Sequence, residues 1–205
     1  MTNIPAELIP LIIFITLIAL LAHKFSLKIA ISRRTRELEE ANEKLEELSI
    51  TDSLTGLKNR RYFGELMSEF NGLDRVGLLI LDIDNFKAIN DRFGHNVGDR
   101  VIQYVAEILK RVSKNGEIIA RIGGEEFAVV TRFDCFDAAN AYAHEIVTLI
   151  EKSTPFFLSD PERVTVSVGL RFYNTKTQTL ALEEADALLY RAKREGKNKV
   201  VAEYD

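Results

Sequence analysis

Two clusters of acidic residues have the types and spacing to do chemistry. Asp82 and Asp84 end an apolar run, and Glu125 and Glu126 directly follow a glycine pair. Carboxylates that converge without basic partners are unstable unless a cation lies between them, and hard oxygen ligands suit Mg²⁺ or Mn²⁺. The pair Gly123–Gly124 would let a bulky ligand approach the backbone. Spacing alone leaves a second interpretation open, in which the two glutamates form the solvated tip of a hairpin.

The elements that must position these acids follow from periodicity. The run Arg75–Asp84 predicts a buried central strand with carboxylates at its C-terminal tip. Two short β runs flank the glycine pair within Glu117–Phe133, which predicts a hairpin. The other expected elements are helices near Arg60–Phe70, Gly98–Lys114, Asp137–Lys152 and Leu182–Arg194 and strands near Arg163–Phe172 and Lys199–Ala202.

The predicted order of elements is β-α-β-β-α-β with additions, the split βαβ or ferredoxin-like plan of an α+β domain. In that plan the first strand is central and the hairpin lies next to it. The two acidic clusters can therefore lie close together.

The N-terminal segment is apolar. Residues Leu8–Ala22 carry no charge, and as a helix they reach about 22 Å, short of the ~30 Å hydrocarbon core. Lys24 and Lys28 can extend their ammonium groups toward the headgroups, which lengthens the usable span. A signal peptide would need a basic start and a small-x-small cleavage site, and an interfacial helix would need a polar face. We therefore expect a transmembrane anchor over residues 1–28.

The charges that flank this span predict its orientation. Five basic residues follow it before the first acid, Glu37: Lys24, Lys28, Arg33, Arg34 and Arg36. The positive-inside rule then places the rest of the chain in the cytoplasm, on a single-pass protein of the inner (cytoplasmic) membrane. The roughly seven residues before the span are too few for an extracytoplasmic sensor domain.

Composition excludes several classes of function. The net charge is −4, so no domain-wide basic field exists and nucleic acid is not an expected partner. The one cysteine, Cys135, cannot form an intramolecular disulfide or a zinc cluster, and we expect it to be a small buried residue.

Residues 29–50 predict a helical, coiled-coil linker. Apolar residues follow the 3, 4, 3 spacing of a heptad seam, which Ile31 extends by seven residues: Leu38, Ala41, Leu45 and Leu48. A single solvated connector helix is the alternative, because two or three heptads are marginal alone. We prefer a parallel dimerising stalk.

Five strings in the chain bear a family resemblance. RIGGEEF (Arg121–Phe127) resembles the signature of the GGDEF family, the diguanylate cyclases. Four other strings resemble further motifs of that family in the same order: DSLTGLKNRR (Asp52–Arg61), DIDNFKAINDRFGHNVGDRVI (Asp82–Ile102), VSVGL (Val166–Leu170) and ADALLYRAKREGKNKV (Ala185–Val200). The resemblance implies a palm-type cyclase domain over residues 51–205.

The resemblance also implies a reaction. Two GTP molecules condense into cyclic di-GMP and release two pyrophosphates, as each 3′-hydroxyl attacks the α-phosphate of the other GTP. Because one domain holds one GTP, a homodimer is required, and effectors that bind cyclic di-GMP act downstream.

The acidic residues match family positions. Asp82 matches the metal-binding aspartate, with the carbonyl of Ile83 as a further ligand for Mg²⁺ or Mn²⁺. Glu125 matches a metal ligand that is also assigned as the base for the 3′-hydroxyl, and the two roles stay open. Glu126 is a second metal ligand or an orienting acid.

Other matches concern the substrate. Asn90 and Asp99 match the guanine-reading positions, and a carboxylate can accept from guanine N1 and N2, which adenine cannot satisfy. His95 matches a substrate-contacting position, with a capping or packing role as the alternative. Gly123 and Gly124 would admit the substrate.

The phosphates have their own expected partners. Phe86 and Lys87 follow the metal strand, where backbone N–H groups at a helix start can bind phosphates. Lys87 would stabilise charge in the transition state, and Lys193 and Lys197 would reach the terminal phosphates. For the last two, a basic helix C-terminus is the alternative. We expect a structural role for Asp84.

One segment departs from the family pattern. Many members carry an inhibitory product site, R-x-x-D, where this chain has Lys114, Asn115, Gly116 and Glu117. Lysine cannot form the bidentate hydrogen bonds of an arginine guanidinium, so we expect feedback inhibition to be weak or absent. A catalytically silent protein that binds GTP or cyclic di-GMP, or a membrane dimerisation scaffold, is the alternative to an active cyclase.

Overall fold

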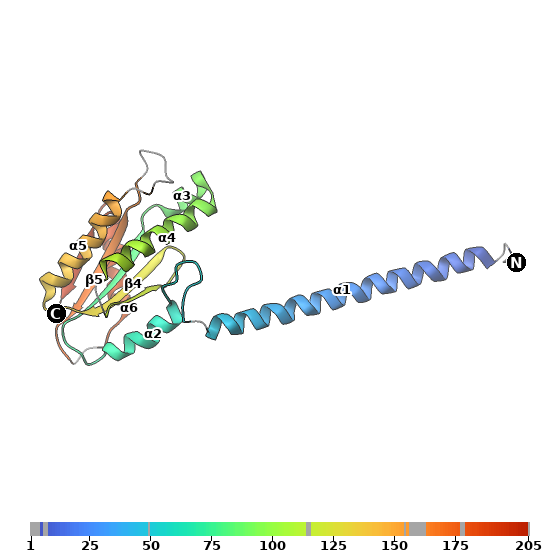
Figure 1. Cartoon of the computed structure of the whole chain (residues 1–205), viewed down its shortest axis with the longest axis horizontal. Coiled ribbons are helices and arrows are strands. Elements are labelled where there is room, and N and C mark those ends of the chain that lie inside the picture. Colours follow the sequence, from blue (N-terminus) through green and yellow to red (C-terminus); the bar gives the residue numbers. More distant parts are fainter. Residues whose placement is uncertain are drawn as a thin grey trace. The chain divides into compact units, whose positions relative to one another are not determined.

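The structure, a computed structural model, describes residues 5, 8–48, 50–113, 116–153, 155, 163–176 and 179–204 (Figure 1). The chain divides into two compact units, Met1–Ser49 and Ile50–Asp205.

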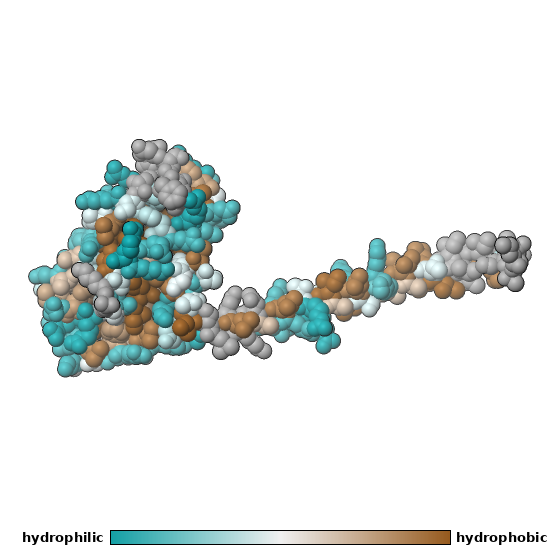
Figure 2. Space-filling view, viewed as in Figure 1, coloured by the Kyte–Doolittle hydropathy of each residue, from teal (hydrophilic) through white to brown (hydrophobic). Residues whose placement is uncertain are grey.

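The first unit is one long helix. Helix α1 (Ile9–Leu48) runs for 40 residues, and its window Phe14–Ala41 is long and apolar enough to cross a membrane by length and composition. None of that window is buried, and Figure 2 shows apolar side chains along the helix. Between Ile9 and Leu48, the predicted anchor and the predicted linker therefore lie on one continuous helix. The side chain of Leu48 lies outside the described part of the chain.

The second unit is built on a six-stranded sheet with the order β1-β3-β4-β2-β5-β6. Its centre is β2 (Val76–Ile83), which is antiparallel to both β4 (Glu126–Arg132) and β5 (Val166–Tyr173). Toward the edges, β3 (Ile118–Arg121) pairs antiparallel with β4 and parallel with β1 (Lys58–Asn59), and β6 (Val200–Tyr204) pairs parallel with β5. The predicted α+β fold, with a central first strand beside a hairpin, is confirmed.

Helices cover both faces of this sheet (Figure 1). They are α2 (Arg60–Met67), with a short 3-10 turn at Ser68–Phe70, α3 (Phe86–Phe93), α4 (His95–Val112), α5 (Phe136–Lys152) and α6 (Leu182–Arg194). The predicted helix limits at Leu182 and Arg194 agree with α6.

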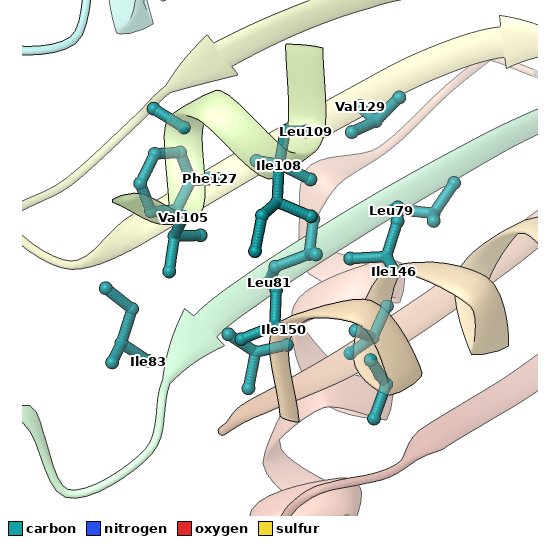
Figure 3. Packing of buried hydrophobic residues seen from close by; sticks show 14 of the residues in the cluster. Leu79, Leu81, Ile83, Val105, Ile108, Leu109, Phe127, Val129, Ile146 and Ile150 are labelled. Carbon is teal, nitrogen blue, oxygen red and sulfur yellow. The ribbon is translucent and has the colours of Figure 1, made fainter. Parts of the chain in front are cut away.

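Alternate residues of β2 face two separate cores. Leu79, Leu81 and Ile83 pack against α4 and α5, as Figure 3 shows with Val105, Ile108 and Leu109 of α4 and Ile146 and Ile150 of α5. Leu78 and Ile80 face the other way, into a core with Phe63 of α2 and Leu189 of α6. All eight residues of β2 are buried, so the strand has no solvent-facing side.

Helix α6 packs unusually close to β5. A Cβ atom on Gly169 would lie 2.1 Å from the carbonyl oxygen of Ala185 and 2.3 Å from the amide nitrogen of Leu189. No side chain fits at position 169, because both neighbours are backbone atoms. The glycine therefore sets the distance between the sheet and α6.

Three local predictions need correction. Helix α4 begins at His95 rather than near Gly98, because Gly94 with φ of 83° separates it from α3. The two-residue strand β1 was not expected. Cys135 is exposed rather than buried, since it lies at the N-cap of α5, before the apolar face of that helix begins. Lys114 and Asn115 lie outside the described residues.

Candidate functional site

The two acidic clusters meet at the end of the central strand. Asp82 lies directly opposite Glu126 on one neighbouring strand and opposite Ser167 on the other. The side chain of Asp82 is only 9% exposed. Burial raises the pKa of this carboxyl, and the nearby charges of Glu125 and Glu126 act in the same direction. Three carboxylates therefore share one corner of the sheet.

A basic side chain already lies against the most buried of these acids. The Nζ atom of Lys193, on α6, is 2.7 Å from Oδ2 of Asp82. This ion pair opposes the effect of burial but does not cancel it. Lys193 was predicted to reach phosphates, and in this structure its ammonium group forms an ion pair with Asp82.

The glycine pair serves two different purposes. A Cβ atom on Gly123 would lie 2.2 Å from Oε2 of Glu126, whereas one on Gly124 would meet nothing within 4 Å. Gly123 therefore makes room for the carboxylate of Glu126, and Gly124 leaves open space at the turn. The backbone N–H of Ile83 donates to the carbonyl of Glu125 at 3.3 Å, which joins the turn to the end of β2.

Arg121 holds the glycine turn from the side. Its Nε and Nη2 atoms donate to the carbonyl of Gly124 at 3.1 and 2.7 Å, and its Nη1 atom donates to both carboxylate oxygens of Asp52. Asp52 also accepts from the backbone N–H and the hydroxyl of Thr55. Burial would raise the pKa of Asp52, but the hydrogen bonds from Thr55 and the charge of Arg121 outweigh it and lower that pKa.

Sequence reasoning assigned no role to Arg121, Asp52 or Thr55. Their pairing joins positions 69 residues apart, which spacing does not reveal. The sequence does offer one signal for Arg121. It is a basic residue two positions before a glycine pair that two acidic residues follow, and such an acidic turn favours a positively charged neighbour.

A second group of predicted residues gathers where α3 meets α4. Phe86 and Asn90 of α3 both approach Gly98 of α4, and Asp99 is the next residue along the chain. The Oδ1 atom of Asn90 is buried and has no hydrogen-bond partner among the described residues. Lys87, His95 and Asp99 are exposed.

The loop after α6 closes the opposite side of the strand end. Nζ of Lys197 donates to Oδ1 of Asn85 at 2.6 Å, directly before α3. Asp84 accepts from the hydroxyls of Ser167 and Thr165 at 2.6 and 2.8 Å and from the backbone N–H of Asn198 at 3.0 Å. All the acceptor groups of Asp84 are thus used within the protein, in agreement with the structural role predicted for it.

The backbone is strained in two neighbouring loops, the one before α3 and the one after α6. Asn85, Lys197 and Asn198 have φ of 56°, 63° and 47°, a left-handed conformation that side chains other than glycine rarely adopt. Such strain persists where surrounding contacts enforce it, and here Asp84 supplies one of them.

The donor set fits a hard divalent cation. Asp82, Glu125 and Glu126 offer carboxylate oxygens, and burial raises the pKa of Asp82, with the charges of the two glutamates acting in the same direction. Within the described ranges, no three acidic, histidine or cysteine side chains form a ready-made metal cluster. The remaining ligands would have to come from a bound molecule with oxygens of its own, such as a phosphate chain.

Comparison with known sequences agrees with this arrangement. The family described as "Diguanylate cyclase, GGDEF domain" matches residues 49–199. The chain belongs to the GGDEF family.

Two similar proteins are longer than this chain. Diguanylate cyclase A of Treponema denticola is 36% identical over 169 residues, which cover 78% of this chain and 46% of that protein. Diguanylate cyclase VdcA of Vibrio cholerae is 35% identical over 170 residues, which cover 80% of this chain and 50% of that protein. The chain therefore spans about half the length of these relatives.

A solved GGDEF structure covers most of the chain. The coiled coil and GGDEF domain of DgcB from Caulobacter crescentus, in complex with c-di-GMP, superimposes with a TM-score of 0.68 at 33% sequence identity. The match covers 87% of this chain and 100% of that one.

Proposed function

We propose that this protein is a diguanylate cyclase that condenses two GTP molecules into cyclic di-GMP and two pyrophosphates. The observation that carries the proposal is the pairing of Asp82 with Glu126 across adjacent strands, beside an intact Gly-Gly-Glu-Glu turn. Membership of the GGDEF family supports it.

Asp82, the carbonyl of Ile83 and Glu125 would hold Mg²⁺, with Mn²⁺ as a possible substitute. The metal would supply charge neutralisation for the phosphates and the attacking oxygen. Glu125 would also accept the proton of the 3′-hydroxyl of one GTP. The oxygen of that hydroxyl would bond to the α-phosphorus of the other GTP as pyrophosphate leaves. Repeating this step from the second GTP closes the ring. Glu126 would act as an orienting acid or bind a second metal ion.

The base and the phosphates would lie on different elements. Asn90 and Asp99 would contact the guanine end, where carboxylate and amide oxygens accept from N–H groups that adenine lacks, and His95 would contact the substrate. The phosphates would lie near the backbone at the start of α3.

Lys87, Lys193 and Lys197 would neutralise the phosphates. Lys193 would exchange its bond to Asp82 for one to a phosphate oxygen, because the divalent cation held with the nucleotide would supply positive charge to that carboxylate.

Catalysis requires two domains, so we propose a homodimer joined through the linker, residues 29–50, and anchored in the inner (cytoplasmic) membrane by residues 1–28. The catalytic domain, residues 51–205, would lie in the cytoplasm, where effectors bind the product. The apolar window in α1 supports the anchor, and the match to a structure that includes a coiled coil supports the linker.

The deciding experiment incubates the detergent-purified full-length chain with GTP and Mg²⁺ and detects cyclic di-GMP by mass spectrometry. The control is Glu125→Ala. We expect product from the wild type and none from the variant. No product from the wild type, with GTP binding retained, would favour the second candidate, a silent nucleotide-binding protein. Replacing residues 29–50 with a strong zipper then separates that candidate from a cyclase that lacks its dimerising signal.

Feedback inhibition is expected to be weak or absent. Glu117 already accepts a hydrogen bond from Ser113 at 3.0 Å, and no arginine occupies position 114. Titration of cyclic di-GMP into the active enzyme tests this expectation, and strong inhibition at low micromolar product would contradict it.

A further inference from the structure

Gly98 occupies a helix position where glycine is unfavourable. It is the fourth residue of α4, and its φ lies outside the left-handed region that would require glycine. Among non-proline residues, glycine has the lowest helix propensity and alanine the highest. The backbone therefore gives no reason for a glycine here, and the reason must lie in the space around it.

The space beside Gly98 is occupied by Asn90. A Cβ atom at position 98 would lie 2.0 Å from Oδ1 and 3.0 Å from Cγ of Asn90, and 3.2 Å from Cζ of Phe86. The first distance is impossible for either orientation of the amide, because its oxygen and nitrogen are of similar size. One of the two residues would have to move.

Neither neighbour can retreat through its backbone. The carbonyl of Asn90 accepts from the N–H of Gly94 at 2.8 Å, and the carbonyl of Gly94 accepts from the N–H of Gly98 at 3.2 Å. These bonds fix the turn between α3 and α4. Phe86 is 9% exposed and belongs to the core on that face of the sheet. A side chain at position 98 would therefore displace the Asn90 amide itself.

Packing against Gly98, and not a hydrogen bond to its oxygen, holds the Asn90 amide in place. Its Oδ1 atom is buried and has no partner among the described residues, although buried acceptors are nearly always satisfied. The acceptor therefore lacks a donor within the described part of the chain, and the proposed guanine ring offers N–H donors on its edge.

We infer that Gly98 is a positioning residue for nucleotide recognition, a role that rests on the proposed function. The absence of a side chain at position 98 fixes the Asn90 amide at the place where it can accept from the base. Gly98 would not touch the nucleotide and would act only through Asn90.

The test compares Gly98→Ala with Gly64→Ala in the full-length chain. Gly64 is also a helical glycine, in α2, and a Cβ atom there would meet nothing within 4 Å. Binding is measured with the α,β-methylene analogues of GTP and ATP, whose α–β link cannot be cleaved. We expect Gly98→Ala to weaken binding of the guanosine analogue about tenfold or more and to reduce the guanine preference by a similar factor. Gly64→Ala should bind as the wild type does.

A double-mutant cycle with Asn90→Ala shows whether the effect passes through Asn90. In that background the amide is gone, and Phe86 needs to move by only a few tenths of an ångström. Gly98→Ala should then change binding less than twofold. It should raise the melting temperature there, because alanine favours the helix, yet lower it in the native background. This sign reversal does not depend on activity, and the double variant is expected to fold even if Gly98→Ala alone does not.

Unchanged binding by Gly98→Ala, or an equal loss with and without Asn90, would overturn the inference. Failure of the proposed guanine site looks different, because the wild-type chain itself would then show no preference for the guanosine analogue. Failure of catalysis alone is seen as absence of cyclic di-GMP from the wild type and leaves this binding comparison unchanged.

Discussion

At the residue scale, the carbonyl of the glycine turn is held by a side chain that comes from outside the acidic cluster. Arg121 donates to the carbonyl of Gly124 and to Asp52 at the same time. Both members of the Arg121–Asp52 pair are largely buried, with side-chain exposures of 16% and 21%. The position of the turn therefore depends on a fork-shaped cation, which lysine cannot imitate.

We expect Arg121→Lys to lower the cyclase rate at least tenfold and to destabilise the fold by about 1.5–3 kcal/mol, the range for hydrogen bonds to charged groups. Mass spectrometry of the product measures the cyclase rate, and urea unfolding measures the loss of stability. Arg132→Lys is the matched control, because Arg132 also donates to a backbone carbonyl and a carboxylate, both of Asp74, but in an exposed pair. Its effect should stay below about 1 kcal/mol. Equal effects in the two variants would contradict the prediction.

The same pair predicts a pH dependence. The pKa of Asp52 is lowered in the folded chain from an ordinary value of 3.8, so its charged form stabilises the fold above that pH. The stabilisation is lost as pH falls through the lower, folded value. The stability difference between the wild type and Asp52→Asn should therefore shrink as pH falls from 5 to about 3. Urea unfolding across this range measures it, and a difference that grows on acidification would refute the assignment.

How much of the site was predictable depends on what each residue contacts. The proximity of the acids at the end of Arg75–Asp84 to those in the hairpin turn was predictable, because the split βαβ plan places the first strand beside the hairpin. The Arg121–Asp52 pair was not, because it joins a loop at the start of the domain to a turn far along the chain. The vacancy that Gly98 leaves for Asn90 was also not predictable, since it depends on how two helices pack.

At the element scale, the approach of α6 to β5 governs where its basic end lies. The helix carries Lys193 to Asp82, and Gly169 lets the helix backbone lie directly on the strand. A methyl group at position 169 would have to push α6 away from the sheet, because both contacts are backbone atoms.

We expect Gly169→Ala to lower the free energy of unfolding by about 1–3 kcal/mol and to reduce the cyclase rate. Gly64→Ala in α2 is the matched control, and it should raise stability by up to about 1 kcal/mol through helix propensity. Urea unfolding of both variants decides the point. An unchanged Gly169→Ala protein would mean that the helix does not need this close approach.

The predicted elements agree with the structure where they are long and periodic, as in α6 and β2. The predictions fail where a single residue determines the end of an element or where an element is very short. Gly94 divides α3 from α4, and β1 has only two residues, too few to show a period. Cys135 is exposed because it precedes a helix rather than lying within one.

At the scale of the whole molecule, two residues of the predicted heptad seam are exposed on the described part of α1. Leu38 and Leu45 are 70% and 66% exposed. They are seven residues apart, at equivalent positions of the heptad, so a second copy of the helix could cover both.

We expect Leu38→Lys with Leu45→Lys to lower the specific cyclase rate at least tenfold at low protein concentration, because two catalytic domains no longer meet. Glu39→Lys is the control, since it places a lysine on the same helix outside the seam. Activity measured against concentration, with sedimentation to follow the dimer, tests the prediction. A double variant that remains dimeric and active would show that the linker does not join the two chains.

The burial of β2 has a further consequence, for hydrogen exchange. The strand is buried at all eight positions and is paired along both edges, so its amide protons can reach water only when the whole domain opens. They should be among the last in the chain to exchange with deuterium. Asp82 therefore lies on a segment that we expect to stay closed while the edge strands and loops open locally.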